Sequence, residues 1–245
     1  MSIAPAGSVR TTLVPFAPVP GVIPAVYSIL VAIAMLVGLV LQAFVLVSTD
    51  QEVGAAMTVS LWTVAAGIVG AKLWFVIGHR ARRFNGWCIQ GFVLCGGVVA
   101  AVGASIHLSM PAGVYLDSMI PALLLGMAIG RLGCFFAGCC CGRQTASRWG
   151  IWSSDQRIGA RRIPTQLLES SLSLATAMVT LILVLGGTPA KPGAVFVGGI
   201  AAYTLGRQFL LPLRARPLST RLGRTVALGT AAVTFTAAIA WSVAT

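Results

Sequence analysis

Seven long apolar runs, separated by shorter polar stretches, dominate the chain from residue 22 to residue 244. A helix that crosses the hydrocarbon core of a bilayer needs about 20 apolar residues, and each run meets or approaches that length. The pattern predicts an all-α polytopic membrane protein with about seven transmembrane helices. Their expected ranges are 22–47, 57–78, 88–109, 118–137, 164–186, 193–213 and 225–244.

The connections between these runs are short, with the exception of the polar, arginine-rich segment 138–163. This leaves no room for a separate soluble domain. We therefore expect residues 1–245 to form a single transmembrane domain, with 138–163 as its longest extramembrane loop.

The amino-acid composition indicates which kind of molecule the positively charged chain binds. The chain is 57% hydrophobic and 9% charged, which excludes an ordinary soluble domain, and its net charge is +12. In a chain this apolar, the positive charge favours anionic lipid headgroups and the membrane surface as partners, and not nucleic acid.

The arginines gather in alternate connections. Clusters follow the second, fourth and sixth apolar runs, whereas the opposite connections carry Asp50, Glu52, Asp117 and Lys191. The positive-inside rule predicts that the arginine-rich face is cytoplasmic. That inference weakens if several of these arginines bind substrate instead.

The motif at residues 130–143 holds the strongest candidate for chemistry. Arg131 interrupts an apolar run, where a charged side chain costs about 2.5–3.5 kcal/mol and is seldom without a role. Arg207 lies near the end of another run, and two arginines on separate helices suit one phosphate group. The alternative for Arg207 is a side chain that reaches to the membrane interface.

Two further groups of residues have plain structural alternatives. Arg162, Gln166 and Glu169 have the spacing of one helical face, and Glu169 opens a long apolar run, so its carboxylate is expected to hold an arginine. The alternative is a simple pair at the end of a helix. The diglycine after Cys95 allows close approach of a lipid or of a neighbouring helix. Tyr27 is either a ligand for a headgroup or a residue of the interfacial aromatic belt.

The six cysteines contain no pair of Cys-x-x-Cys motifs, and the two histidines lie elsewhere in the chain, so no metal site is expected. Cys88 fits a buried apolar position. The three consecutive thiols of Cys139, Cys140 and Cys141 cannot all face one apolar surface, and a disulfide in this cluster is an open alternative.

Several motifs, in the same order along the chain, resemble those of the prolipoprotein diacylglyceryl transferase family. They are residues 130–135 with Gly138 and Gly142, the Pro-Thr-Gln-Leu-Leu-Glu stretch 164–169, the segment 203–209, the Gly-Ala-Lys-Leu turn 70–73, and Cys95 with its diglycine. The resemblance implies a seven-helix enzyme of the bacterial cytoplasmic (inner) membrane, with a site that faces outward.

The resemblance also implies a reaction. A diacylglyceryl group moves from phosphatidylglycerol, or another anionic phospholipid, to the thiol of a lipobox cysteine in a prolipoprotein, without a cofactor. By motif position, Arg131 and Arg207 correspond to the essential, catalytic arginines. The expected substrate-binding residues are Tyr27, Cys95, Gly96, Gly97, Cys134, Gly138, Gly142, Arg143, Arg162, Gln166 and Glu169.

The chain departs from the family pattern at several chemically active positions, which keeps two other functions open. One is a divergent relative that uses a different acceptor or its own thiols at Cys139–Cys141, and the other is a non-enzymatic protein that binds anionic lipids. The departures are Cys134 for an asparagine, Cys139 for a glutamate, Cys95 for a histidine or tyrosine, Ile163 for a histidine, Leu211 for a glutamate and Lys72 for an arginine.

Overall fold

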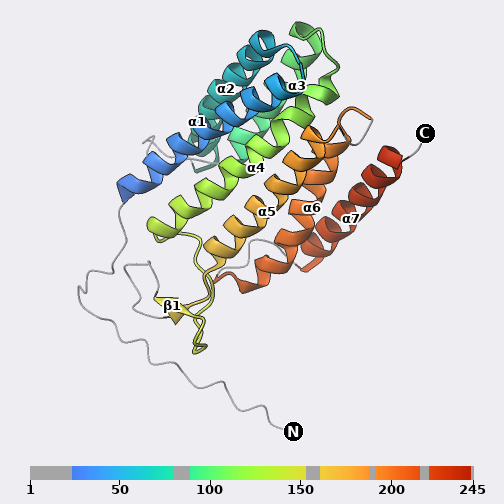
Figure 1. Ribbon diagram of the computed structural model, residues 1–245. Coiled ribbons are helices and arrows are strands. Elements are labelled where there is room, and N and C mark those ends of the chain that lie inside the picture. Colours follow the sequence, from blue (N-terminus) through green and yellow to red (C-terminus); the bar gives the residue numbers. More distant parts are fainter. Residues whose placement is uncertain (1–23, 80–88, 153–160, 188–190, 216–220, 244–245) are drawn as a thin grey trace. The chain divides into compact units, whose positions relative to one another are not determined.

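The computed structural model describes residues 24–79, 89–152, 161–187, 191–215 and 221–243, and these residues form seven α-helices (Figure 1). Two sets of residues from the sequence analysis lie outside the described residues: Cys88, for which a buried position was predicted, and the arginines at positions 80, 82, 83, 157 and 216. The helices are α1 (Pro24–Ser48), α2 (Val53–His79), α3 (Ile89–His107), α4 (Ala112–Phe136), α5 (Thr165–Leu185), α6 (Ala194–Leu210), which the 3₁₀ turn η1 (Leu211–Leu213) extends, and α7 (Arg221–Val243).

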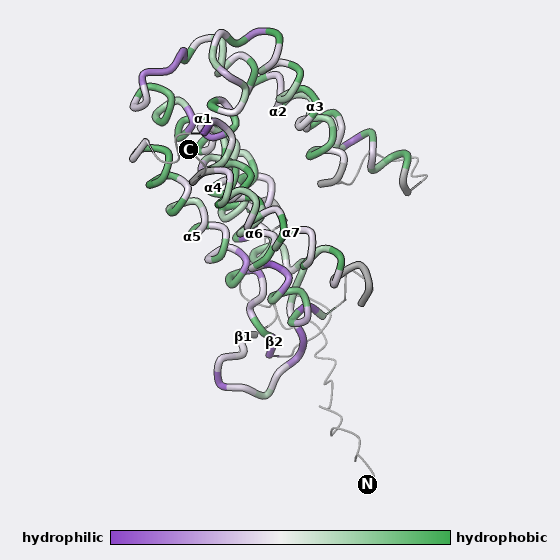
Figure 2. The backbone as a smooth tube through the Cα atoms, turned by 90° about the vertical axis from the view of Figure 1, so that its right-hand side faces the viewer, coloured by the Kyte–Doolittle hydropathy of each residue, from purple (hydrophilic) through white to green (hydrophobic). Residues whose placement is uncertain are grey.

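Within the described residues, five helices are long and apolar enough to cross a membrane: α1, α2, α4, α5 and α6. The apolar parts of α3 and α7, Gly91–His107 and Thr225–Trp241, are shorter. Figure 2 shows hydrophobic residues along the helices and hydrophilic ones near the strands β1 (Ile151–Trp152) and β2 (Arg161–Arg162). The prediction of an all-α polytopic membrane protein is confirmed.

Helix α4 begins at Ala112, six residues before its predicted start, and this changes the role of Asp117. The sequence placed Asp117 in a connection, but it lies inside α4, where its carboxylate accepts hydrogen bonds from the backbone N–H groups of Gly193 (2.6 Å) and Phe196 (2.7 Å). The first N–H groups of a helix lack partners within that helix. Asp117 therefore caps the start of α6, and backbone N–H groups take the place of water as hydrogen-bond donors to its carboxylate.

Contacts divide the chain into two compact units. The second unit comprises residues 35–123, 177–200 and 234–245. Within it α2 and α3 pack closely, because Gly67, Gly70 and Gly91 leave no room for a side chain between the helices. A buried polar network also joins its helices: Ser60 donates to Gln42 (2.8 Å) and lies 3.0 Å from the hydroxyl of Tyr115. Paired in this way, these polar groups are tolerated in an apolar interior.

The first unit comprises residues 1–34, 124–176 and 201–233, and it contains both arginines predicted to be catalytic. Small residues bring its helices together. A side chain at Gly126 would press on the backbone of Ala34 in α1, and one at Gly206 would overlap Leu172 in α5. At Gly130, by contrast, no atom lies within 4 Å of the added Cβ position.

The connection between α4 and α5 also belongs to the first unit, and it contains a short antiparallel ladder that the sequence did not predict. Ile151 pairs with Arg162, and Trp152 pairs with Arg161. An isolated bridge joins Gly142 to Arg214, so the connection is also fastened to the segment that follows α6. The long loop therefore lies against the helix ends that carry the candidate site.

Candidate functional site

Glu169 lies at the centre of the site and positions the arginines around it. It lies in the second turn of α5, it is completely buried, and its carboxylate joins two arginines from other parts of the first unit. Arg131 of α4 donates through Nε to Oε2 at 2.8 Å, and Arg214 donates to both carboxylate oxygens. This geometry agrees with the expectation that Glu169 holds an arginine. A buried carboxylate with two such partners fixes the position of both guanidinium groups.

Positive charge exceeds negative charge around this carboxylate. Glu169 is the only acidic residue in the described part of the first unit. One carboxylate cannot neutralise two guanidinium groups, and the side chain of Arg131 remains 18% exposed. The site therefore has a net attraction for an anion. The arginines of this unit that precede α7 in the described residues are Arg131, Arg143, Arg148, Arg161, Arg162, Arg207 and Arg214.

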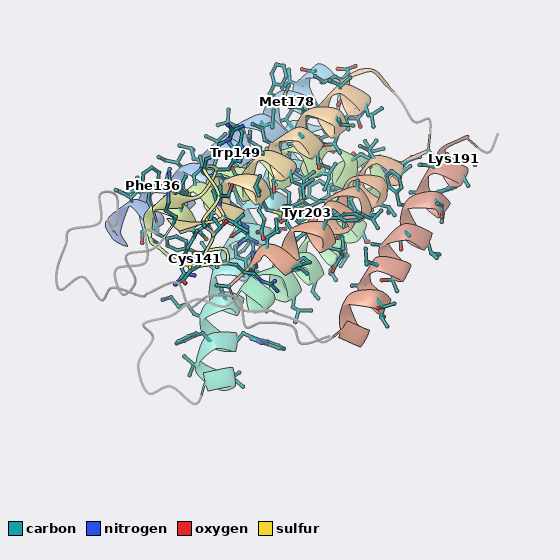
Figure 3. The ribbon with its side chains drawn as sticks, turned by 90° about the horizontal axis from the view of Figure 1, so that it is seen from below. Phe136, Cys141, Trp149, Met178, Lys191 and Tyr203 are labelled. Carbon is teal, nitrogen blue, oxygen red and sulfur yellow. The ribbon has the colours of Figure 1, made fainter. Side chains whose placement is uncertain are left out.

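Helix α6 contributes two polar side chains to the first unit. Tyr203, labelled in Figure 3, and Arg207 lie one helical turn apart, and Tyr203 is close enough to Arg131 to interact with it electrostatically. The Tyr203 hydroxyl and the Arg207 Nε are buried, and neither has a hydrogen-bond partner among the described residues. Buried polar atoms are rarely left unpaired, so these two groups are candidates to bind a ligand.

The loop after α4 is held in place through its backbone. Gly138 ends the helix with a left-handed φ of 68°, a conformation that glycine adopts at little cost. Gln166 donates to the carbonyl of Cys139 at 2.9 Å, and Thr165 donates to the carbonyl of Cys140 at 3.2 Å. The start of α5 thus fixes the positions of two cysteines that the sequence singled out.

Arg162 departs from its predicted position. It was expected on one helical face with Gln166 and Glu169, but it lies in β2, because α5 begins at Thr165. Pro164 disfavours a helical conformation in the residue before it. Arg162 is buried, and its Nη1 donates to the carbonyl of Gly142 at 3.0 Å.

The backbone around Gly142 and Arg143 joins the loop to the end of α6. A side chain at Gly142 would overlap the carbonyl of Ile163, so only glycine fits there. The N–H of Arg143 donates to the carbonyl of Leu213 at 2.8 Å, whereas its side chain is exposed. These backbone contacts at Gly142 and Arg143 also position Arg214, the residue after Leu213, beside the site.

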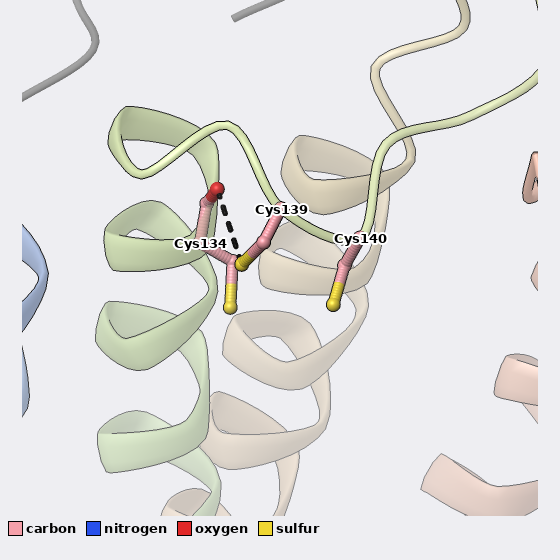
Figure 4. A group of neighbouring side chains, drawn as sticks. All are labelled: Cys134, Cys139 and Cys140. Carbon is pink, nitrogen blue, oxygen red and sulfur yellow. Dashed lines mark hydrogen bonds between the residues drawn. The ribbon is translucent and has the colours of Figure 1, made fainter. Parts of the chain in front are cut away.

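Three thiols lie together at the end of α4. The sulfur atoms of Cys134, Cys139 and Cys140 are all within 4.8 Å of one another (Figure 4), and this group could hold a metal ion. Cys141 lies outside the group. The described cysteines are free thiols, so no disulfide forms among them.

The thiols in the loop have unequal acidities. Hydrogen bonds with Cys134 and Cys139 lower the pKa of the Cys140 thiol, and the positive charges of Arg214 and Arg131 act in the same direction. Hydrogen bonds with Cys134 and Cys140 raise the pKa of the Cys139 thiol. The two neighbouring thiols of the loop therefore differ in the direction of their pKa shifts.

Tyr27 and the diglycine motif, both predicted to bind substrate, lie in different units of the chain. Tyr27 lies in the first unit, against Gly133 of α4, and near enough to Arg131 and the thiols to interact with them electrostatically. The diglycine motif lies in the second unit. There Cys95 packs against Gly70, and Gly96 approaches the backbone of Thr63, which supports helix packing for these two residues. Gly97 has no atom within 4 Å of its added Cβ position.

Sequence reasoning did not nominate Arg214, Tyr203 or Ser170 as site residues. Arg214 was counted only among the arginines that bias orientation, although it is 5% exposed and binds Glu169. Ser170 donates to the carbonyl of Ala128 at 2.8 Å and so aligns α5 with α4. Tyr203 stood inside a recognised motif, and its place one turn before Arg207 was the available signal.

The fold and the site together define a multi-pass membrane protein in which a buried carboxylate fixes two arginines, Arg131 and Arg214. The sequence profile described as prolipoprotein diacylglyceryl transferase matches residues 19–244, and the chain belongs to that family.

Relatives with the name phosphatidylglycerol–prolipoprotein diacylglyceryl transferase occur in several bacteria. The protein of Nostoc sp. (strain PCC 7120) is 29% identical over 213 residues, which cover 78% of this chain and 75% of the relative. The protein of Rhodococcus jostii (strain RHA1) is 25% identical over 246 residues, covering 88% and 68% of the two chains. One from Streptomyces coelicolor, whose name ends in the numeral 2, is 29% identical over 214 residues, covering 79% and 67%.

Proposed function

We propose that this protein transfers a diacylglyceryl group from phosphatidylglycerol to the cysteine thiol of a prolipoprotein. The observation that carries the proposal is the fixed and partly exposed guanidinium of Arg131, held by Glu169 and close to Tyr203. One helical turn after Tyr203, the buried Nε of Arg207 has no hydrogen-bond partner among the described residues. Membership of the family, and the printed names of the relatives, support the same reaction.

In the proposed step, the acceptor thiol loses its proton to solvent, and its sulfur attacks the glyceryl carbon that carries the phosphate. The carbon–oxygen bond to phosphate breaks, and its electron pair leaves on the oxygen of glycerol phosphate. Charge on the phosphate increases as the bond breaks, so donors that are already in position around it lower the barrier. Arg131 and Arg207 fill this role, and Tyr203 adds a hydroxyl donor.

The other nominated residues have supporting roles in the proposal. Tyr27 and Cys134 line the space around Arg131. Gly138, Gly142, Arg143, Arg162 and Gln166 shape the loop that bounds the site, and Glu169 orients Arg131. Cys95, Gly96 and Gly97 remain proposed lipid contacts on family resemblance alone.

The proposed location is the bacterial cytoplasmic membrane, with the site facing outward. Apolar helices of spanning length support insertion in a membrane. The family resemblance implies the outer side for the site and therefore for the acceptor that reaches it.

The test uses purified protein in vesicles that contain phosphatidylglycerol, with a lipobox peptide as acceptor. Mass spectrometry should detect a peptide that is heavier by one diacylglyceryl group. Arg131→Ala should slow the reaction by about 10²–10³, the usual cost of one donor to a developing oxyanion. Arg131→Lys should retain part of the activity, because it keeps the charge and loses the planar fork.

Arg148→Ala is the matched control, since Arg148 is an exposed arginine of the same loop that lies outside the motif 130–143 and stacks on Trp149. Its rate should stay within about twofold of the wild type, in line with the small effects of most surface substitutions. A rate that falls equally in the Arg148 and Arg131 variants would show that net charge alone matters, and the proposal would fail.

The exposed free thiol of Cys140, whose backbone Thr165 holds in place, favours a second candidate, in which the protein's own thiol is the acceptor. Such a step forms a carbon–sulfur bond, and a thioether is a poor leaving group, so the product would be a permanently modified protein. Intact-mass measurement separates the two reactions. A single diacylglyceryl increment on the protein, with none on the peptide, would support self-modification, and bound lipid without either increment would indicate a binding protein.

A further inference from the structure

The cluster of Cys134, Cys139 and Cys140 has the composition and spacing of a metal site. Zinc binds thiolates at about 2.3 Å, so two sulfurs of a tetrahedral site lie about 3.8 Å apart. The three sulfurs here are all within 4.8 Å of one another, which is within a small side-chain adjustment of that geometry. The sequence predicted no metal because it lacks paired Cys-x-x-Cys motifs, whereas the fold brings together one helical cysteine and two from the loop.

The backbone is built to hold these thiols in place. Cys140 has a left-handed φ of 57°, which is uncommon for a residue other than glycine. Hydrogen bonds from Thr165 and Gln166 hold the carbonyls of Cys140 and Cys139, so the turn is fastened to α5 on both sides of the bend. Figure 4 shows the side chain of Cys139 directed from the loop towards Cys134 at the end of α4. Backbone strain of this kind persists where surrounding contacts enforce it, often at functional sites.

The charge of the site and its number of ligands both suit a divalent zinc ion. Three thiolates and one divalent ion carry a single negative charge, which equals the single positive charge remaining on Arg131, Arg214 and Glu169 together. Zinc prefers four ligands, and three protein ligands leave one position open, as in catalytic zinc sites. Cys139 and Cys140 are exposed, so a ligand from outside the protein can reach that position.

We propose that Cys134, Cys139 and Cys140 hold one zinc ion, and that its open position takes the acceptor thiol as a thiolate. The metal site stands on the geometry of the three sulfurs, whereas its role towards the acceptor rests on the proposed function. A thiol that coordinates zinc loses its proton, which passes to solvent. The bound sulfur then attacks the glyceryl carbon, the carbon–oxygen bond breaks, and the thioether, a weaker ligand, leaves the metal.

This arrangement supplies a step that the rest of the site lacks. The thiolate is the nucleophilic form of cysteine, and the first unit contains no histidine to remove the acceptor's proton. The departures from the family pattern at Cys134 and Cys139 contribute two of the three ligands. Arg131 lies close enough to Cys140 to act on it electrostatically, so phosphate and acceptor sulfur would meet in one place.

The first experiment measures binding without turnover. Full-length protein, reduced, freed of metal and placed in lipid nanodiscs, is titrated with Co²⁺, whose visible bands report tetrahedral thiolate coordination. We expect one equivalent to bind, Zn²⁺ to displace it, and Cys139→Ser to weaken binding at least tenfold. Cys141→Ser is the matched control and should bind as the wild type does. Equal loss in both variants, or no cobalt–thiolate absorption in the wild type, would overturn the metal site.

Alkylation of the wild-type protein covers the case in which a variant fails to fold. With Zn²⁺ present, mass spectrometry should show Cys134, Cys139 and Cys140 protected from iodoacetamide, and Cys141 modified at its metal-free rate. Uniform reactivity of all four thiols with and without Zn²⁺ would contradict the proposal.

The second experiment tests the acceptor's role. A lipobox peptide added to the Co²⁺ protein should shift the cobalt bands, and the same peptide with serine for cysteine should not. Removal of Zn²⁺ should slow transfer at least 100-fold, and added Zn²⁺ should restore it. Full activity without metal would overturn activation by zinc and leave the proposed function intact. Bound metal with a peptide-induced shift but no transfer would contradict the proposed function and support the site.

Discussion

Glu169 is the residue on which the geometry of the site depends most. It is completely buried and is shared between Arg131 and Arg214, so its negative charge offsets one of the two positive charges that these arginines bring into the first unit. Buried ion pairs contribute little net stability when compared with apolar replacements, but removal of one partner leaves an uncompensated charge. We therefore expect the carboxylate to stabilise the fold and to fix the direction in which Arg131 points.

We predict that Glu169→Gln destabilises the protein by about 3–5 kcal/mol, the typical cost of breaking a buried pair. The amide keeps the shape of the side chain and loses the charge, so both guanidinium groups lose their counter-ion. Thermal unfolding in nanodiscs measures the change. The matched variant is Glu52→Gln, which alters an exposed carboxylate that accepts a hydrogen bond from Ser109 and should shift stability by less than about 1 kcal/mol. Equal shifts in the two variants would show that Glu169 has no special structural role.

At the scale of elements, the loop between α4 and α5 is positioned by close backbone contacts. Gly142 lies between the start of α5 and the segment after α6, bridged to Arg214 and overlapped by Ile163 and Thr165 if a side chain is added. Small-to-large changes in packed positions typically cost about 1–3 kcal/mol. The loop and Arg214 should therefore move together when this contact is disturbed.

We predict that Gly142→Ala lowers the stability of the protein by about 1–3 kcal/mol, because the added methyl group meets the carbonyl of Ile163. Gly229→Ala is the control: the position lies in α7 with no atom within 4 Å of the added Cβ, and alanine favours a helix by about 1 kcal/mol over glycine. Chemical or thermal unfolding of both variants gives the comparison. If Gly142→Ala proves as neutral as Gly229→Ala, the loop is not fastened as described.

The elements also show what the sequence could and could not predict. Helices α5 and α6 were predicted at 164–186 and 193–213 and form at Thr165–Leu185 and Ala194–Leu210, because apolar runs between polar ends locate such helices well. The partner of Glu169 was predicted only as an arginine. Arg214 could not be singled out, because it reaches Glu169 through η1 and the bridge to Gly142, contacts that span 45 and 72 positions in the chain.

The thiol cluster illustrates the same limit. Cys134 has helical neighbours that the sequence indicates, but Cys139 and Cys140 join it only because Gly138 ends the helix and Cys140 turns with positive φ. Backbone conformations of this kind depend on the contacts that enforce them, and the residue types alone did not indicate them.

At the scale of the whole molecule, the proposed function determines which side of the membrane the loop between α4 and α5 must face. The arginine-rich connections favour a cytoplasmic loop by the positive-inside rule, whereas a lipobox acceptor requires a site that faces outward. Part of the conflict is removed by the roles of two arginines. Arg162 and Arg214 are buried and bonded within the protein, so they add less to the charge of the surface than their number suggests.

We predict that a cysteine at the exposed position of Ser147 is labelled in intact cells by a maleimide that cannot cross membranes. Tryptic cleavage after Arg143 and Arg148 separates this position from Cys139–Cys141, so tandem mass spectrometry assigns the label without ambiguity. Ser109→Cys is the control, because one spanning helix, α4, separates it from Ser147 and places it on the opposite side. It should react only after the membrane is permeabilised. The reverse result, with position 109 labelled in intact cells and position 147 protected, would place the loop in the cytoplasm, away from any lipobox acceptor, and would exclude the proposed transfer at this site.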